Sequence, residues 1–222
     1  AQVMFWFMRQ AGVPEMDPNT LNSNLSSEEA VAALQLMVDV YEASMGNNNK
    51  VGGGFVGGNH AMEVYSPTIL GHIKKGNPEL LDDIGVFAPQ RYPDSTPVSH
   101  AFINGLAISQ ASENKDLAWE FIKLINSDEH LLGIMEVAGW ITGRTDLVRQ
   151  AVAIQPKIDL WYNIMPYLQN YMIPPPRNTA QQEVNKLVKQ ALNRQIAPRT
   201  AVEQADRVWQ PLIADWKEQL GR

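Results

Sequence analysis

The 222-residue sequence contains no cysteine. This absence excludes disulfide bonds, thiol nucleophiles and zinc sites built from thiolates, because each of them needs a cysteine sulfur. It does not fix the compartment, since many exported bacterial proteins also avoid cysteine. Evidence on location must therefore come from other features of the chain.

Positive charge and long apolar runs are also scarce. The chain has 18 Lys and Arg against 24 Asp and Glu, which gives a net charge of -6 and a pI near 5.2. Binding to a nucleic-acid backbone depends on a basic surface that releases counterions, so no nucleic-acid partner is expected. The apolar patch at residues 3–8 is far shorter than the roughly 18 to 20 apolar residues that cross a bilayer.

Patterns typical of enzymes and metal sites are missing. The glycine-rich stretch at residues 46–58 lacks the Lys-Ser or Lys-Thr ending of a phosphate-binding loop, and there is no Gly-x-Ser-x-Gly nucleophile elbow. The adjacent acidic pairs at 28–29 and 82–83 are explained by a helix start and a polar turn. No two of the four histidines have a short metal-ligand spacing: His60, His72, His100 and His130. We therefore expect no catalytic residue, no metal and no cofactor.

Several helices are predicted from apolar spacing and capping residues. Ser26 and Glu29 form a capping box ahead of apolar residues at steps of three and four. A helix over 113–126 and a second one ending at Gly139 follow later in the chain. The C-terminal third has a helical pattern that is broken by prolines, with a second capping box that opens at Thr200. With 45% apolar residues, the chain can bury a sizeable core.

Three short strands are predicted between these helices. They cover residues 60–65, 83–88 and 101–109, and the last is apolar enough to be buried on both faces of a sheet. A helix that runs to Lys75 is expected after Ser66, with Pro67 at its first position. The alternation of strands and helices predicts an α/β fold.

Four segments carry a resemblance to a known family. They are HAMEVYSP at 60–67, DIGVFAPQ at 83–90, NGLAISQASENKDLAWEFIKLINSDEH at 104–130 and GWITGRTDL at 139–147. Their order and spacing resemble those of extracytoplasmic solute-binding proteins of ABC importers, in the sugar-binding family that includes maltose-binding protein. The third segment is the most specific of the four.

The resemblance implies a fold and a division into lobes. It implies a helix-rich α/β lobe of the periplasmic-binding-protein type (class II) with part of a second lobe, the N-terminal lobe being largely missing. Residues 1–94 and 138–222 would form the C-terminal lobe, and 95–137 would belong to the N-terminal lobe. Because a strand at 101–109 would then lack its neighbours, self-association through 95–137 is expected.

The resemblance also implies a way of binding. In such proteins a sugar stacks its apolar ring face on aromatic side chains, polar groups bind its hydroxyls, and closure of two lobes buries it. Each candidate position also has a plain structural explanation, as packing, a turn or an exposed helix end. Trp6 could line the cleft, but its neighbours Phe5 and Phe7 favour a place in the core. The positions that match ligand-contacting motifs are Tyr65, Ser66, Asn104, Gly105, Trp140, Arg144 and Arg177.

The function implied by the resemblance is solute capture. The chain is expected to bind a mono- or oligosaccharide outside the cytoplasmic membrane, in the periplasm or extracellularly, and to deliver it to the membrane permease of an ABC transporter. A lipid anchor in a region ahead of the present sequence would fit this location. The alternatives are a non-sugar solute such as a polyamine, a metal chelate or an anion, a helical interaction module, and an enzyme on a similar scaffold.

Overall fold

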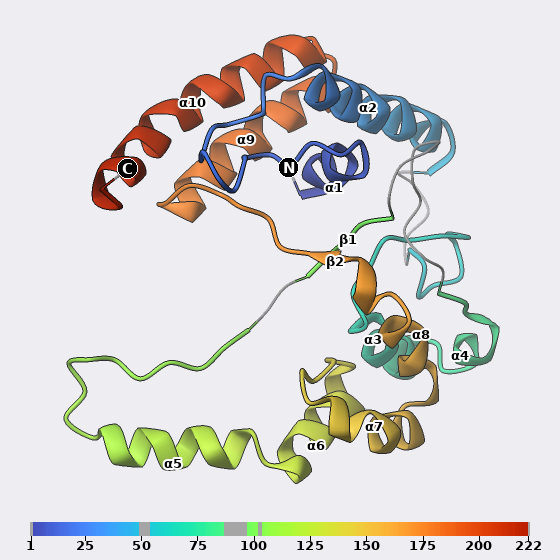
Figure 1. Cartoon of the computed structure of the whole chain (residues 1–222). Helices are drawn as coiled ribbons and strands as arrows, with labels where there is room; N and C mark the ends of the chain where they lie inside the picture. Colours follow the sequence, from blue (N-terminus) through green and yellow to red (C-terminus); the bar gives the residue numbers. More distant parts are fainter. Residues whose placement is uncertain (1, 49–53, 87–96, 102–103, 222) are drawn as a thin grey trace. The chain divides into compact units, whose positions relative to one another are not determined.

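The computed structural model describes residues 2–48, 54–86, 97–101 and 104–221 (Figure 1). The chain divides into two compact units. Unit 1 combines Ala1–Asn49, Pro89–Ala101 and Tyr167–Arg222, and unit 2 combines Lys50–Ala88 and Phe102–Pro166. Each unit is therefore assembled from segments that are distant in the sequence.

Unit 1 is built mainly of long helices. α1 (Gln2–Gln10) packs on α2 (Glu28–Asn48), and α9 (Arg177–Leu192) packs on α10 (Pro198–Gln219), which also contacts α2. Beside them, β1 (Ser99–His100) pairs in parallel with β2 (Leu168–Gln169). This is the one sheet found among the described residues.

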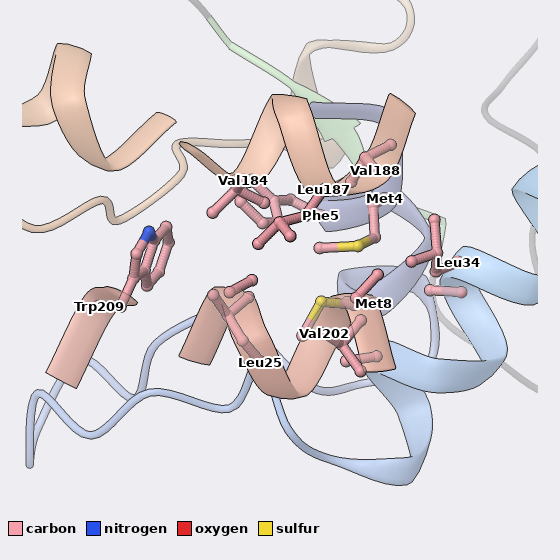
Figure 2. Close-up of a cluster of buried hydrophobic side chains, with 14 of the residues drawn as sticks. Met4, Phe5, Met8, Leu25, Leu34, Val184, Leu187, Val188, Val202 and Trp209 are labelled. Carbon is pink, nitrogen blue, oxygen red and sulfur yellow. The ribbon is translucent and has the colours of Figure 1, made fainter. Parts of the chain in front are cut away.

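The core of unit 1 lies between these four helices (Figure 2). Phe5 and Trp209 are fully buried, and their ring centroids are 5.7 Å apart. The indole N–H of Trp209 donates a hydrogen bond to the carbonyl of Ala180 at 3.2 Å, so its polar atom is satisfied inside the core. Each large apolar side chain buried in this way contributes about 1.5–3 kcal/mol.

Unit 2 is made of shorter helices. These are α3 (Ile69–Gly76), α4 (Leu80–Asp83), α5 (Lys115–Ile125), α6 (Asp128–Ala138), α7 (Val148–Ile154) and α8 (Asp159–Tyr162). Three 3-10 turns accompany them, at Thr145–Leu147, Pro156–Ile158 and Met165–Tyr167, the last at the junction with unit 1. The core of unit 2 contains Leu70, Ile73, Met135, Ile158 and Trp161 among its buried side chains.

The helices were predicted better than their starting residues. α2 begins at Glu28, and the hydroxyl that accepts a backbone N–H there belongs to Ser27, so the cap predicted at Ser26 is wrong. α2 also continues to Asn48, into the stretch expected to be a loop, whose residues 49–53 lie outside the described part. α10 begins at Pro198, which suits the first helical position, so the capping box predicted at Thr200 is also wrong. The predicted end of α6 at Gly139, in a left-handed conformation (φ 69°), is confirmed.

The predicted strands are not formed where the structure describes them. Residues 60–65, 84–86 and 104–109 have no strand pairing, while 87–88 and 102–103 lie outside the described residues. A strand needs a hydrogen-bonded neighbour, and the described part offers only the two-residue pair β1–β2. Similarly, α3 begins at Ile69, so Pro67 precedes the helix instead of opening it.

Candidate functional site

Six of the seven positions selected from the sequence lie in unit 2, and Arg177 lies in unit 1. Within unit 2, the segment before α3 packs directly on the end of α6. A Cβ atom added to Gly139 would lie 2.5 Å from the carbonyl oxygen of Pro67, so only glycine fits at this contact. The structure therefore brings Ser66 and the segment that leads to Trp140 together.

Polar and aromatic side chains are exposed around this contact. The Ser66 and Thr68 hydroxyl oxygens are 2.5 Å apart, and Ser66 is exposed. Trp140 keeps 48% of its surface accessible, as does Tyr65, whose ring lies edge-on to His72 at 6.0 Å. Two adjoining segments that carry an exposed indole and two hydroxyl groups offer chemical groups suited to a sugar ring.

Arg144 is held in place by two carboxylates. Its Nε donates to Asp146 Oδ1 at 2.8 Å, and its Nη2 lies 3.1 Å from Asp128 Oδ1. The hydrogen bond with Asp146 is the main cause of a raised Arg144 pKa, to which the Asp128 charge adds. The Arg144 side chain is 43% exposed, so it can still meet a ligand oxygen, but its charge is already balanced by the two carboxylates. This pairing makes Arg144 a weak site for an isolated anion.

Asn104 and Gly105 are the other two unit 2 positions selected from the sequence. Both are exposed, and both precede α5 in a segment without regular structure. None of the hydrogen bonds of the described residues joins either of them to Tyr65, Ser66, Trp140 or Arg144, so their place in a site stays a prediction.

In unit 1, Arg177 begins α9 near a cluster around the two short strands. His100 of β1 stacks on Tyr171 with ring centroids 3.6 Å apart, and the Arg9 guanidinium lies 5.6 Å from the Tyr171 centroid. Trp6 belongs to the same region, because its indole N–H donates to the Val98 carbonyl next to β1.

The electrostatics of this cluster follow from burial and two arginines. Burial lowers the pKa of His100 to about 4, and the nearby charges of Arg177 and Arg9 lower it further, against a backbone hydrogen bond to Gln169 that raises it. Burial likewise raises the pKa of the Tyr171 phenol. His100 is therefore a neutral ring at physiological pH.

Glu15 fixes the position of Arg9. Its carboxylate is fully buried and accepts two hydrogen bonds from Arg9, both of 2.8 Å, and one from the backbone N–H of Met172. The Arg9 Nη1 then donates to the Gln169 side chain at 3.0 Å. The cluster is consequently preorganised around the aromatic rings.

Sequence reasoning missed most of this cluster. Trp6 was assigned to the core, yet it is only partly buried and stacks on Phe7, while Phe5 is fully buried. His100 and Tyr171 are 71 positions apart, so no local spacing could connect them. One usable signal was the helical pattern itself. Adjacent residues on a helix face different directions, so this pattern does not favour placing Trp6 and Phe5 in the same core.

Metal and membrane features were searched in the described residues. No group of three or more His, Asp or Glu side chains there could hold a metal ion. No helix in the same residues is both long and apolar enough to cross a membrane. Neither result identifies a ligand.

Comparison with solved structures shows the fold. An ABC transporter solute-binding protein from Thermotoga lettingae TMO, bound with alpha-D-tagatose, matches 95% of this chain at 18% identity and a TM-score of 0.74. Maltose-bound MalE3 of T. maritima matches 94% at 18% identity and 0.70. The sugar-binding protein MalE of Xanthomonas citri matches 99% at 15% identity and 0.76. The predicted fold class, a helix-rich part of a periplasmic-binding-protein-like α/β fold, is confirmed.

The chain spans 56–57% of the length of these three structures. A family model described as bacterial extracellular solute-binding protein matches residues 1–159, which is most of the chain. That match covers both Trp6 and the 139–147 segment, although not Arg177. The chain therefore belongs to the family of bacterial extracellular solute-binding proteins.

Proposed function

We propose that this chain takes part in binding a mono- or oligosaccharide outside the cytoplasmic membrane, without catalysing a reaction on it. The observation that carries the proposal is the close contact of Gly139 with Pro67, because it brings the segment that carries the exposed Trp140 against the segment that carries the Ser66 and Thr68 hydroxyls. An aromatic ring beside hydroxyl groups matches the apolar face and the hydroxyl edge of a sugar.

Similar proteins support the sugar class. The structures from Thermotoga lettingae and T. maritima hold tagatose and maltose, and the X. citri protein is described as sugar-binding. In unit 2, Tyr65, Asn104, Gly105 and Arg144 are proposed as further ligand contacts. Arg177 is proposed as a ligand contact of unit 1. Because Arg144 is already paired with two aspartates, an anion is a less suitable ligand than a neutral sugar.

The proposed physiological partner is the membrane permease of an ABC transporter. Membership in the extracellular solute-binding family supports this partner and a periplasmic or extracellular location. A lipid anchor belongs to the same proposal. The partner is tested by binding of the chain to membranes that contain the permease. An excess of free ligand-loaded protein should compete with this binding and remove it.

We also propose that residues 95–137 belong, in the whole protein, to a different lobe from 1–94 and 138–222. This division differs from that of the compact units, in which Met135 packs in one core with Leu70 and Ile158. Supporting the proposed division, the apolar stripe of α5 is exposed, with Leu117, Phe121 and Leu124 at 70%, 56% and 52%. A stripe of this kind is typical of a helix that packs against another element. Self-association through this segment follows from the same exposure, and sedimentation should show a dimer that Phe121→Ser reduces to a monomer.

The sugar-binding proposal is tested by calorimetric titration with glucose, tagatose, maltose and longer maltodextrins. Trp140→Ala should weaken binding at least tenfold, because a stacking platform is removed. Trp119→Ala is a matched control, since Trp119 is similarly exposed (53%) but lies on α5. An equal effect of the two substitutions, or no binding of any of these sugars by the wild-type chain, would contradict the proposal.

A further inference from the structure

A cavity of about 430 Å³ lies in unit 2 beside α3. It is formed on one side by the turn at residues 54–59 and on the other by the C-terminal half of α3. The lining side chains that matter for its chemistry are those of Phe55, Glu63, Tyr65, His72 and Lys75. Apart from Tyr65, none of them belongs to the candidate site above.

The wall opposite α3 is a defined turn. The backbone N–H of Asn59 donates to the Gly54 carbonyl at 3.0 Å, and Gly54 has a left-handed conformation (φ 55°). The Asn77 side chain, just after α3, donates to the Val56 carbonyl at 3.2 Å and ties the turn to the helix. The cavity is therefore open to solvent and is bordered by hydrogen-bonded backbone on one side and by a helix on the other.

Glu63 and Gly76 set two further boundaries. A Glu63 carboxylate oxygen accepts the Phe55 backbone N–H at 3.3 Å, which holds the acid at the cavity wall. A Cβ atom added to Gly76 would lie 3.0 Å from a Val56 methyl group, so the absence of a side chain there lets the turn approach the helix.

The lining combines aromatic rings with charges of both signs. Tyr65 and Phe55 offer apolar ring surface, while Glu63 can only accept hydrogen bonds when ionised and Lys75 can only donate them. A ligand with a net charge of either sign would meet a like charge in this space. A neutral hydroxyl group can donate to Glu63 and accept from Lys75, so mixed charges favour hydroxyl-rich ligands.

We propose that this cavity is a separate binding site for a neutral, hydroxyl-rich ring of monosaccharide size. Its volume lies toward the small end of the range of about 300–1,000 Å³ found for ligand pockets. The ring face packs on Tyr65 and Phe55, and the hydroxyls bind Glu63, His72 and Lys75. The proposal does not depend on sugar binding at Trp140, although Tyr65 belongs both to the residues proposed for that site and to those that line the cavity.

The test uses three compounds with the same ring and different charge: D-glucose, D-glucosamine and D-glucuronate. Binding to the full chain is followed by two-dimensional NMR titration at neutral pH. D-glucose should bind at millimolar concentration and shift the amide signals of residues 54–59 and of α3, and both charged compounds should bind at least fivefold more weakly. Absence of saturable shifts at these amides with D-glucose up to 50 mM, or preference for a charged compound, overturns the proposal.

Matched substitutions identify the groups involved. Glu63→Gln and Lys75→Met should each weaken D-glucose binding about ten- to hundredfold, as expected when a hydrogen bond to a charged group is lost. Glu79→Gln and Lys74→Met are controls on exposed neighbours outside the cavity and should change affinity less than twofold. If a cavity variant unfolds, protection of 54–59 from hydrogen exchange by D-glucose in the wild-type chain decides the matter, and its absence refutes the site.

The two proposals fail independently. Trp140→Ala should leave the shifts at 54–59 unchanged, whereas Lys75→Met should leave Trp140-dependent binding unchanged. Shifts at 54–59 that disappear with Trp140→Ala would refute the separate cavity and leave sugar binding at Trp140 intact.

Discussion

Replacing Gly139 by alanine should destabilise unit 2 more than any other glycine-to-alanine change in α3 or α6. Gly139 has φ 69°, a conformation that costs an ordinary residue about 1–2 kcal/mol. The new methyl group would also lie 2.5 Å from the Pro67 carbonyl oxygen, and relief of such overpacking costs typically 1–3 kcal/mol. Together these effects predict a loss of about 2–5 kcal/mol of unfolding free energy.

The comparison is with Gly133→Ala in the middle of α6. A Cβ atom at Gly133 meets nothing within 4 Å, so alanine should stabilise the helix by about 0.5–1 kcal/mol. The two substitutions therefore have opposite predicted effects on stability although they are only six positions apart.

Urea unfolding followed by circular dichroism measures the effect on the chain. Because two units need not unfold together, hydrogen exchange of the α6 amides supplies the local free energy. Gly139→Ala should also weaken sugar binding at Trp140, since Ser66 is displaced when the Pro67 segment moves. A loss below 0.5 kcal/mol with Gly139→Ala, or the same sign for both glycines, would refute this account of the contact.

Three further substitutions test unit 1. Glu15→Gln should lower the stability of unit 1 by about 3–5 kcal/mol, because it leaves the Arg9 side chain, which is only 11% exposed, without its buried carboxylate, and urea unfolding measures the loss. Trp209→Ala should cost about 3–5 kcal/mol by leaving a cavity in the core, whereas Trp119→Ala on exposed α5 should change stability by less than about 0.5 kcal/mol. The His100 pKa of about 4 lies below the ordinary 6.5, so the unfolded chain binds a proton first and stability falls as pH drops from 6.5 to 4. His100→Phe should flatten that part of the stability profile, and an unchanged pH dependence would contradict the role given to burial of the ring.

Sequence reasoning reached the helices and the family, whereas the selected site residues stay predictions. Apolar spacing identified α2, and the glycine after α6 was correctly placed in a left-handed conformation, because these signals act within one or two helical turns. Capping residues were placed a few residues away, since several polar side chains compete near each helix start. Trp6 was assigned to the core together with Phe5, because composition cannot show which side of a short helix is covered.

The sequence by itself determined the family, the helical segments and the absence of thiol chemistry. Only tertiary structure decided which residues meet. The stack of His100 on Tyr171 and the bond of Glu15 to Met172 join parts of the chain separated by at least 71 positions, and no periodicity carries that information. The predicted strand at 101–109 depended in the same way on a neighbour, because a strand is stabilised by hydrogen bonds to another segment, whereas a helix forms its own.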